Sequence, residues 1–557
     1  EQATLAGMNW NRTSISIAIF LASLLLFVPF LGDSYLFDWD EVNFAEAARE
    51  MLVTGEFSYV QINFRPFWEK PPLFIWMQAL SMSVFGINEF AARFPNAVCG
   101  AVTLVLLFNI GSKLVSNKFG LLWVLIYTGS LLPQFYFRSG IIDPWFNLFI
   151  FLGIHQLICA TEHEQLNKLQ LGASALLIGL AVMTKGPTAL GLVGICAVIY
   201  FLTSFRNHKW KIADGIVYLT IVLVVGFSWF FIEIAKGHGY VIQEAIDYHI
   251  RLFAKNEAGH GEPFYYHPIV LLIGCFPMSL FLLFSWTRKT EAPSNIAHYS
   301  KWMTILFWVV LVVFSIVKTK IVHYSSLTYF PMSFLAAWFI HASFDKKIIF
   351  KHWQQAVLIL FILILGTAFV LLGILDSVKE PLLELLKNDG FALGNFSQYV
   401  PDGRFDFLIG IFFILGGLTS VLLINKTKNA SLGLFAISLI TVTLLSTAIA
   451  PKIDKYTQAS LFDFYKSKSE DAYLQPLGFH SYAHLFYGRK TPVTIETDDE
   501  PKWMVFEKVD KPVYFIVKPR DLEATLNYFP HLQEIDRKGG YIILERTDEN
   551  YPFLEAP

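Results

Sequence analysis

Long apolar segments constrain the fold of this chain more than any other feature of its sequence. An α-helix needs about 20 mostly apolar residues to cross a bilayer, and hydrophobic residues make up 54% of the chain. We therefore predict an all-α polytopic membrane protein with about thirteen transmembrane helices. The candidate segments lie near residues 14–32, 93–115, 119–137, 141–160, 169–184, 186–204, 214–235, 268–286, 300–317, 325–343, 353–376, 406–424 and 430–450.

The basic loops between these segments predict the orientation. Leu73–Gly86 is too short to cross easily and contains Gln78, so we interpret it as an interfacial or re-entrant helix. With this segment left out, the loops rich in lysine and arginine all fall on one side, which the positive-inside rule makes cytoplasmic. These loops hold Lys113 and Lys118, Arg206 to Lys211, Arg288 and Lys289, Lys346 to Lys351, and Lys426 and Lys428. The N-terminus is thus predicted inside and the C-terminus outside.

The chain divides into two predicted domains. Residues 8–450 form the transmembrane domain, whose first outer loop, 33–92, carries amphipathic helices. Residues 451–557 form a soluble α/β domain on the outer, periplasmic side, because charged sequence there alternates with short apolar runs. Two of these runs, Val513–Val517 and Tyr541–Glu545, are predicted to be strands.

Composition also limits the partners of this chain. The net charge is −2, so no overall basic field suggests a nucleic-acid partner. The four cysteines lie inside apolar segments without paired spacing, which is typical of small core residues. We expect a monomer whose surroundings are the lipid bilayer.

Unusual polar residues gather at the predicted outer ends of the spans. Charge at such positions is costly and is usually there for function, and positive charge on the outer face suggests a local anionic partner. These residues come from several loops, so they can meet only in the folded protein. They are Asp40, Glu41, Glu69, Lys70, Asp143, Lys185, His249, Arg251, His260, Lys318, Lys320 and Tyr324.

Asp40, Glu41 and Asp143 are the candidate catalytic carboxylates. Asp40 and Glu41 open a predicted amphipathic surface helix, Glu41–Leu52, and Asp143 precedes Pro144 at the start of a span. The alternative is that Asp40 and Asp143 only cap their helices, since Asp is a favoured N-cap and Asp-Pro is a common helix opening.

Several cationic residues form a candidate phosphate site. Lys70 precedes Pro71 and Pro72, which stiffen the backbone and favour an extended lysine. The alternative is that Lys70 only extends its ammonium group to the membrane interface. Several ammonium groups on one face favour a phosphate clamp, because together they offset the charge of a phosphate. The candidate donor-phosphate residues are Lys70, Lys185, Arg251, Lys318, Lys320 and Tyr324.

Glu69 and His249 are candidate metal ligands. Imidazole and carboxylate groups suit zinc, although these residues show no tight ligand spacing. The alternative, ordinary loop residues with ordinary hydrogen bonds, is favoured for His260 and is equally open for Glu69 and His249. The sequence requires no cofactor, and a divalent metal such as zinc stays open.

At these residues the chain resembles the bacterial aminoarabinose transferases (ArnT) and, more distantly, the protein O-mannosyltransferases of the GT-C membrane glycosyltransferase class. The resemblance covers roughly the first 340 residues. Its most specific parts are Asp40-Glu41 and Glu69-Lys70-Pro71-Pro72. The weaker parts are Asp143-Pro144, Thr184-Lys185-Gly186, His249 with Phe253, Ala254 and His260, and Ser315 with Lys318, Lys320 and Tyr324.

The resemblance implies a GT-C fold and an inverting transfer of a sugar from a polyprenyl-phosphate donor. The sugar would be 4-amino-4-deoxy-L-arabinose or a related one, and the acceptor would be lipid A, at the periplasmic face of the bacterial inner membrane. It also implies that Asp40 is the leading catalytic carboxylate, that Lys70, Lys185, Lys318 and Tyr324 lie near the lipid phosphate, and that Glu69 and His249 lie near a zinc site. One departure is that Arg251 is shifted by one position from the family's His-x-x-Arg-Phe pattern.

Two alternatives remain open on the sequence. The first keeps the chemistry but transfers the sugar to Ser or Thr of exported proteins. The second is a membrane transporter. Transporter sites usually lie deep within broken helices, whereas these charges cluster at span ends, which favours an enzyme.

Overall fold

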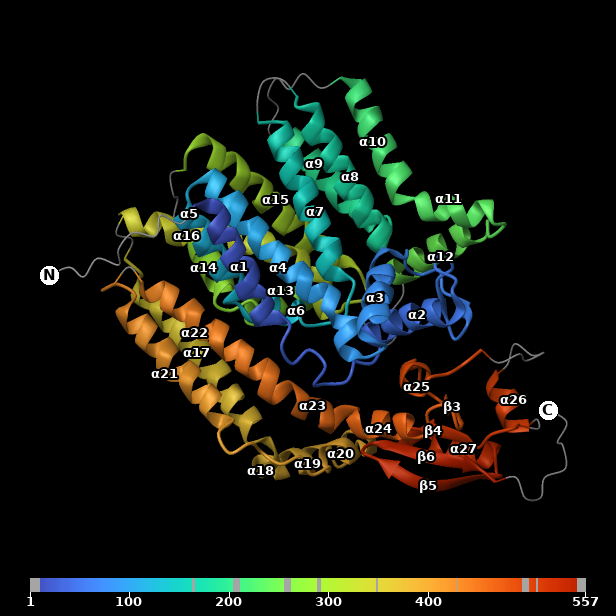
Figure 1. Cartoon of the computed structure of the whole chain (residues 1–557). Coiled ribbons are helices and arrows are strands. Elements are labelled where there is room, and N and C mark those ends of the chain that lie inside the picture. The colour runs from blue at the N-terminus through green and yellow to red at the C-terminus, as the bar shows by residue number, and fades with distance from the viewer. Residues whose placement is uncertain are drawn as a thin grey trace.

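The computed structural model describes residues 11–162, 166–203, 211–254, 262–287, 292–346, 349–427, 429–492, 500–506 and 509–547. Helices dominate this part of the chain, and a small sheet lies near the C-terminal end (Figure 1). The expected all-α membrane fold with a C-terminal α/β region is thereby confirmed. Each of the thirteen predicted segments contains at least one helix.

The apolar helices form a bundle that fills most of Figure 1. Within it α7 packs along α8, α4 along α5, and α10 along α8. Its elements up to residue 346 are α1 (Arg12–Phe27), α4 (Glu89–Leu114), α5 (Asn117–Thr128), α6 (Leu131–Tyr136), α7 (Asp143–Ala160), α8 (Lys168–Lys185), α9 (Thr188–Thr203), α10 (Ile212–Gly226), α11 (Ser228–Ala235), α12 (Val241–Ala254), α13 (Tyr266–Gly274), α14 (Met278–Trp286), α15 (Ser294–Ile316), the 3₁₀ helix η2 (Val322–Thr328) and α16 (Tyr329–Lys346).

Few of these helices are long and apolar enough to cross a membrane without help. Over the whole described chain four helices meet that standard, or six if the two bent pairs α10–α11 and α13–α14 each count as one span; the four are Glu89–Leu114, Ser294–Ile316, His352–Gly373 and Ala430–Thr457. Other predicted segments are covered by shorter apolar helices such as α1 and α9. The structure therefore supports a multi-pass membrane protein, and the number thirteen stays a prediction.

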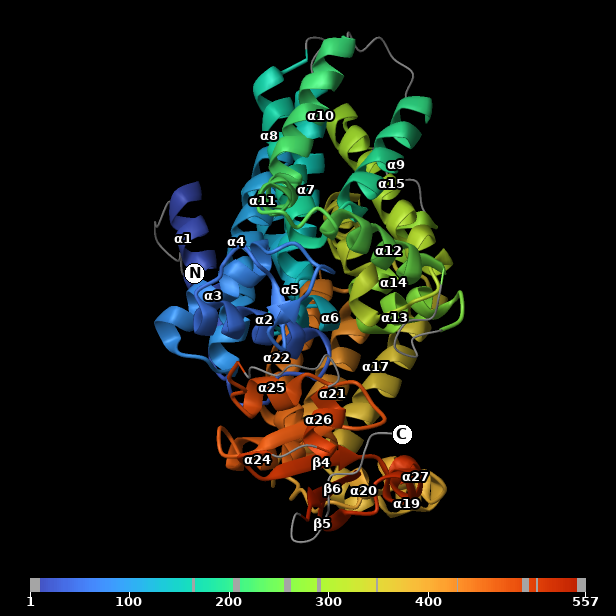
Figure 2. The same ribbon diagram turned by 90° about the vertical axis from the view of Figure 1, so that its right-hand side faces the viewer.

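The first predicted outer loop folds into a compact unit beside the bundle. It holds α2 (Asp40–Thr54), the short antiparallel pair β1 (Gln61–Ile62) and β2 (Arg65–Pro66), and α3 (Leu73–Phe85). The amphipathic helix predicted at Glu41–Leu52 is confirmed as α2, which ends at Gly55 in the left-handed conformation that favours glycine. In both views α2 and α3 lie between the bundle and the C-terminal region (Figure 2).

The C-terminal third begins with a second group of long helices, in which α17 packs along α21 and α21 along α22. The predicted domain boundary after residue 450 falls within a continuous helical stretch, Ala430–Thr457. The elements of this stretch and its surroundings are α17 (His352–Gly373), α18 (Leu375–Val378), α19 (Glu380–Leu386), α20 (Gly390–Phe396), α21 (Phe407–Leu423), α22 (Ala430–Leu444), the π-helix η3 (Leu445–Ile449), α23 (Ala450–Thr457) and α24 (Ala459–Ser467).

A four-stranded sheet of order β3-β4-β6-β5 forms the core of the C-terminal domain. Strand β3 pairs parallel with β4, and the other two pairs are antiparallel. The two predicted strands are confirmed as β4 and β6. The elements are β3 (Tyr473–Pro476), α25 (Ala483–Tyr487), α26 (Glu500–Phe506), β4 (Val513–Val517), η4 (Pro519–Asp521), α27 (Leu522–Tyr528), β5 (Leu532–Lys538) and β6 (Tyr541–Arg546).

Candidate active site

A polar cavity of about 380 Å³ lies where the first outer loop, the ends of several bundle helices and the C-terminal domain meet. We call it the polar cavity. It brings together residues from positions 39 to 482 of the chain, so no local pattern defines it. Its lining is Trp39, Asp40, Asn43, Phe44, Phe67, Glu69, Lys70, Ile142, Asp143, Lys185, Arg251, Thr319, Ile321, His323, Tyr324, His480 and Tyr482.

Asp40 is the first residue of α2 and its side chain faces the polar cavity. The N-cap of α2 is Trp39, and no side chain caps this helix. The Asp40 carboxylate instead lies 3.1 Å from Nε2 of His323, the second residue of η2. The capping alternative for Asp40 is therefore wrong, because its carboxylate is used across the cavity.

Asp143 shows the same arrangement at the start of α7. The N-cap is Ile142, no side chain provides a capping bond, and Pro144 occupies an early position of the first turn. Oδ1 of Asp143 accepts a hydrogen bond of 2.6 Å from Nζ of Lys185, while Oδ2 lies 3.6 Å from Nε2 of His323. The capping alternative is wrong here too. His323 thus lies between the two carboxylates.

The charges around Asp40 fix its ionisation. Burial acts to raise the pKa of Asp40, but the hydrogen bond from His323 and the positive charges of His323, Lys185 and Lys70 outweigh it. The pKa of Asp40 therefore lies below its ordinary value. An aspartate held in this way stays ionised at neutral pH and can accept a proton.

Lys70 lies close to the carboxylates of the same cavity. Burial lowers the pKa of the Lys70 ammonium, and the negative charges of Glu69, Asp40 and Asp143 offset part of that effect. A buried ammonium is costly to keep charged. A bound anion therefore stabilises it more than the same anion would stabilise an ammonium in water. Lys70 is therefore well placed to meet a phosphate.

Four of the six predicted phosphate-binding residues line the polar cavity: Lys70, Lys185, Arg251 and Tyr324. Nζ of Lys185 lies 4.9 Å from the centre of the Tyr324 ring, a cation–π distance. The other two predicted residues, Lys318 and Lys320, are not part of the lining that the described chain provides.

Lys318 and Lys320 have other surroundings, and we leave both out of the phosphate site. Lys318 is exposed. Lys320 is buried, and its Nζ donates a hydrogen bond of 2.7 Å to the carbonyl of Val317, directly after α15. Cations at this position stabilise the free carbonyls at a helix C-terminus.

Glu41, the third predicted catalytic carboxylate, is buried and fully engaged. Arg93 of α4 donates to both of its oxygens at 2.8 and 2.9 Å, and the N–H groups of Phe37 and Gly140 also donate to it. Burial would raise the pKa of Glu41, but the charge and hydrogen bonds of Arg93 lower it below the ordinary value. Glu41 therefore joins the segment before α2 to α4 and to the segment before α7.

Arg93 extends this junction to the segment that leads to Asp40. Its Nη1 donates to the carbonyls of Leu31 and Ser34 at 2.8 and 2.9 Å, and its Nη2 donates to the carbonyl of Tyr35 at 2.7 Å. A guanidinium offers five donors in a rigid fork, so one side chain can fix a whole turn of backbone. The sequence analysis did not single out Arg93.

The predicted metal site is only partly described. Glu69 lines the polar cavity, whereas the side chain of His249 and all of His260 lie outside the described residues. Among the residues that the structure describes, no three His, Cys, Asp or Glu side chains are placed to hold a metal ion. The zinc site of Glu69 and His249 therefore stays a prediction.

Among the lining residues that the sequence did not indicate are Trp39, His323, His480 and Tyr482. His323 directly precedes the predicted Tyr324, and Trp39 directly precedes Asp40, so both were within reach of the same reasoning. His480 and Tyr482 belong to the C-terminal domain, where no motif indicated a site.

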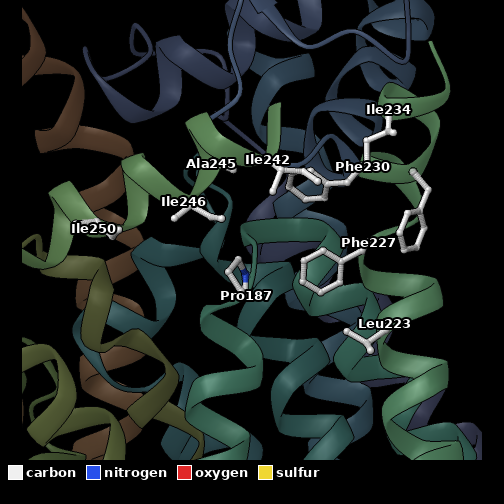
Figure 3. Close-up of a pocket in the computed structure, with 10 residues that line it drawn as sticks. Pro187, Leu223, Phe227, Phe230, Ile234, Ile242, Ala245, Ile246 and Ile250 are labelled. Carbon is white, nitrogen blue, oxygen red and sulfur yellow. The ribbon is translucent and has the colours of Figure 1, made fainter. Parts of the chain in front are cut away.

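Two further cavities have mainly apolar linings. The first, the apolar groove, has a volume of about 720 Å³ and runs between α10, α11 and α12 (Figure 3). In Figure 3 Phe227 and Phe230 lie opposite Ile242 and Ile246 of α12. The lining of the groove includes Pro187, two residues after Lys185 in the sequence, and Ile250, which precedes Arg251.

The second apolar cavity has a volume of about 520 Å³. Trp39, Asp40, Ile321 and His323 line both this space and the polar cavity, so these residues form the wall between them. The rest of its lining is mainly hydrophobic but includes two more carboxyl groups: Phe37, Asp38, Glu41, Leu132, Phe135, Tyr136, Ser139, Ile141, Val322 and Tyr329.

These features define a polytopic membrane protein with the fold of the GT-C glycosyltransferases. The crystal structure of ArnT from Cupriavidus metallidurans bound to undecaprenyl phosphate has a TM-score of 0.71 against this structure. It covers 96% of this chain and 99% of that chain at 16% sequence identity. The particular likeness is thus to ArnT, as the sequence resemblance predicted.

Sequence comparison agrees with the fold. The family described as dolichyl-phosphate-mannose-protein mannosyltransferase matches residues 69–231. An uncharacterized protein of Aquifex aeolicus is 29% identical over 337 residues, which is 59% of this chain and 74% of that protein. An undecaprenyl phosphate-alpha-4-amino-4-deoxy-L-arabinose arabinosyl transferase of Pectobacterium carotovorum subsp. carotovorum is 27% identical over 342 residues. That match spans 60% of each protein, less than two thirds of the transferase's length.

Proposed function

We propose that this protein is an inverting glycosyltransferase that moves a sugar from a polyprenyl-phosphate donor to lipid A at the periplasmic face of the bacterial inner membrane. One observation carries the proposal. An ionised aspartate, Asp40, shares a cavity with Lys70, Lys185 and Arg251, and a mainly apolar cavity shares Asp40 and His323 with it. The names of the similar transferases favour 4-amino-4-deoxy-L-arabinose as the sugar.

The donor phosphate would lie among Lys70, Lys185 and Arg251. Several cations near one phosphate stabilise the negative charge that gathers on its oxygens as the sugar leaves. The polyprenyl chain would run into the apolar groove (Figure 3), whose lining residues Pro187 and Ile250 are close in sequence to Lys185 and Arg251. The related ArnT of known structure was crystallised with undecaprenyl phosphate, which supports this donor class.

Asp40 would act as the general base. The acceptor oxygen attacks the anomeric carbon of the sugar, and the bond between that carbon and the phosphate oxygen breaks. The phosphate leaves with the electron pair as polyprenyl phosphate, while Asp40 takes the proton of the acceptor group. His323 holds the Asp40 carboxylate at 3.1 Å, and Lys185 engages Asp143 at 2.6 Å. A single attack from one side inverts the configuration at the anomeric carbon.

The second apolar cavity favours a lipid acceptor. It shares the wall that contains Asp40 and His323, so an acceptor lying in it can present a polar group to Asp40. A mainly hydrophobic lining suits acyl chains better than the solvated backbone of a Ser- or Thr-containing peptide. This supports lipid A over an exported protein.

The enzyme assay that tests this proposal uses the purified protein in nanodiscs. Undecaprenyl phosphate carrying a radiolabelled aminoarabinose is supplied with lipid A or with a Ser/Thr-rich exported protein. We expect label on lipid A and free undecaprenyl phosphate as the second product. Label on the protein would support the O-glycosylation alternative. Passage of intact donor across the bilayer of proteoliposomes without sugar release would support the transporter.

The periplasmic placement of the polar cavity has its own test. Cysteines are introduced one at a time at Glu56, exposed in the first outer loop, and at Lys118, exposed at the start of α5. A membrane-impermeant maleimide applied to spheroplasts should label the cysteine at position 56 and not the one at 118. Labelling of position 118 alone would reverse the proposed orientation.

A further inference from the structure

The C-terminal domain extends one short segment into the polar cavity. Residues Phe479 to Tyr482 connect strand β3 to helix α25, after a turn at Gly478 whose φ of 75° favours glycine. Within this segment His480 and Tyr482 line the polar cavity. A domain whose sequence shows no catalytic motif therefore contributes two side chains to the site.

Three rings from two domains meet at this wall. The rings of Trp39 and His480 lie 5.1 Å apart with their planes at 60°, and those of His480 and Tyr482 lie 4.7 Å apart with their planes at 75°. Both contacts are of the edge type that aromatic pairs favour. We call Trp39, His480 and Tyr482 the aromatic wall.

The backbone of Trp39 supports a functional role for this wall. Trp39 has φ 91°, a region that residues other than glycine rarely adopt. Such a conformation persists only where the surrounding structure fixes it, and residues of this kind cluster at functional sites. It turns the chain between the segment that Arg93 holds and the helix that begins with Asp40.

Hydrogen bonds fasten the same segment to the C-terminal part of the chain. The N–H of Leu36 donates to the hydroxyl of Tyr487 at 2.7 Å, and Gln458 both accepts from the N–H of Asp38 and donates to the carbonyl of Leu36. The Asp38 carboxyl also shares a hydrogen bond with Ser481. These hydrogen bonds hold the segment next to Trp39 against the part of the chain that carries His480 and Tyr482.

The wall is neutral, in contrast to the cations of the same cavity. Burial lowers the pKa of His480, and the charge of Asp38 offsets only part of that effect. Burial, together with Glu69 and Glu50, raises the pKa of Tyr482 to about 12. Neutral rings with hydrogen-bonding edges suit a sugar, whose apolar ring faces stack on aromatics and whose hydroxyl groups need donors and acceptors.

We propose that the aromatic wall of Trp39, His480 and Tyr482 contacts the transferred sugar and selects it, so that the C-terminal domain is the specificity element of the site. The inference rests on the proposed function, since it assigns the sugar to one part of the donor site. The phosphate end would lie at the cations, and the sugar would extend from it toward the wall.

The test compares two lipids by thermal unfolding of the full chain in nanodiscs. Undecaprenyl phosphate without a sugar reports on phosphate and lipid binding, and undecaprenyl phosphate carrying 4-amino-4-deoxy-L-arabinose adds the sugar. Wild type should be stabilised by both lipids and more by the second. His480→Gln and Tyr482→Phe should keep the response to the first lipid and lose the additional response to the second. Tyr528→Phe, an exposed tyrosine of α27, is the matched control.

Each outcome is decisive. If both variants keep the additional response, the inference is wrong while the proposed function stands. If wild type responds equally to both lipids, the sugar is not recognised, and the inference is again wrong. If wild type responds to neither lipid, the proposed function fails and the inference fails with it. A variant that unfolds without lipid is replaced by the other, since each removes one group of the same wall.

A kinetic measurement sharpens the result. With donors that carry different sugars, Tyr482→Phe should reduce the ratio of kcat/KM between the preferred sugar and an analogue lacking one hydroxyl group. We expect a change of about tenfold or more, because a site built to hydrogen-bond a hydroxyl rejects the analogue without it. An unchanged ratio would contradict the assignment.

Discussion

The two ends of helix α2 carry carboxylates in opposite states. At its start, Asp40 has a pKa below the ordinary value because His323, Lys185 and Lys70 outweigh its burial. Farther along, Glu50 is fully buried and its pKa is raised to about 9, first by burial and then by the neighbouring Glu46. One helix thus holds an ionised acid at the cavity and a protonated acid in its interior.

The difference lies in how the nearby cations are used. Arg49 donates to both oxygens of Glu46 at 2.6 and 2.7 Å, and its charge lowers the pKa of Glu50 too little to offset burial and Glu46. Glu50 instead accepts the N–H groups of Asn63 and Phe64 at 2.6 and 2.8 Å. Burial alone therefore does not decide ionisation. Whether a buried carboxyl group of this protein is ionised depends also on the cations that act on it.

The largest expected effect comes from removing the charge at Asp40. Asp40→Asn keeps the shape of the side chain but cannot accept a proton, so turnover should fall by on the order of 10²-fold or more. Because Asp40 does not cap α2, the unfolding temperature should stay close to that of wild type. Sugar release from radiolabelled donor and thermal unfolding measure the two effects.

Asp536→Asn, in the exposed strand β5, is the control for this substitution and should leave turnover unchanged. Near-normal turnover of Asp40→Asn would move the role of base to Asp143, the other carboxylate beside His323.

A smaller loss is expected from the cations that serve the phosphate. Lys70→Met should weaken binding of undecaprenyl phosphate by roughly 10- to 150-fold, the range of about 1.5–3 kcal/mol for a hydrogen bond to a charged group. Lys318→Met, an exposed lysine outside the cavity lining, is the matched control and should bind the lipid normally. Equal losses in both variants would show that the lipid responds to overall charge and not to this site.

The next effect is a shift of the pH profile. Replacing His323 by glutamine removes the charge that helps to lower the pKa of Asp40. The acid limb of kcat/KM, which reports the base of the free enzyme, should therefore move to higher pH than in wild type. An unmoved limb would show that Lys185 and Lys70 alone keep Asp40 ionised.

The smallest effect concerns stability at the other end of α2. The folded state holds a proton on Glu50 up to a pKa of about 9, whereas the ordinary value is 4.5. The unfolded chain releases that proton earlier, so stability falls as pH rises between these two values. Glu50→Gln should flatten this decline in unfolding temperature and leave turnover near normal. A decline as steep as that of wild type would place the titrating group elsewhere.

Sequence reasoning located much of the polar cavity because charge within an apolar chain is costly wherever it occurs. Asp40, Glu69, Lys70, Asp143, Lys185 and Arg251 were predicted on that ground, and all line the cavity; Tyr324, predicted from its position after the lysines, lines it too. The same reasoning could not separate Lys318 from Lys70, because exposure at a helix end depends on the direction in which the following segment turns. Glu41 was grouped with Asp40 although its partner, Arg93, lies on another helix.

The missed residues are those whose role comes only from contacts between distant parts of the chain. His480 carries no signal in its own segment, and it enters the cavity because β3 and α25 are placed against the first outer loop. The capping interpretation of Asp40 and Asp143 failed for a similar reason. Local preference favours a cap, but a cation across the cavity competes for the same oxygens.

The hydrogen bond between Asp38 and Gln458 has a consequence for the order in which the protein is synthesised and folds. The two residues are 420 positions apart, so the ribosome adds almost the whole chain after Asp38 before its partner exists. The early helices must enter the bilayer while the segment before Asp40 still lacks its final support. A chain cut short before Gln458 would thus lack both the support of the segment before Asp40 and the two residues His480 and Tyr482 of the polar cavity.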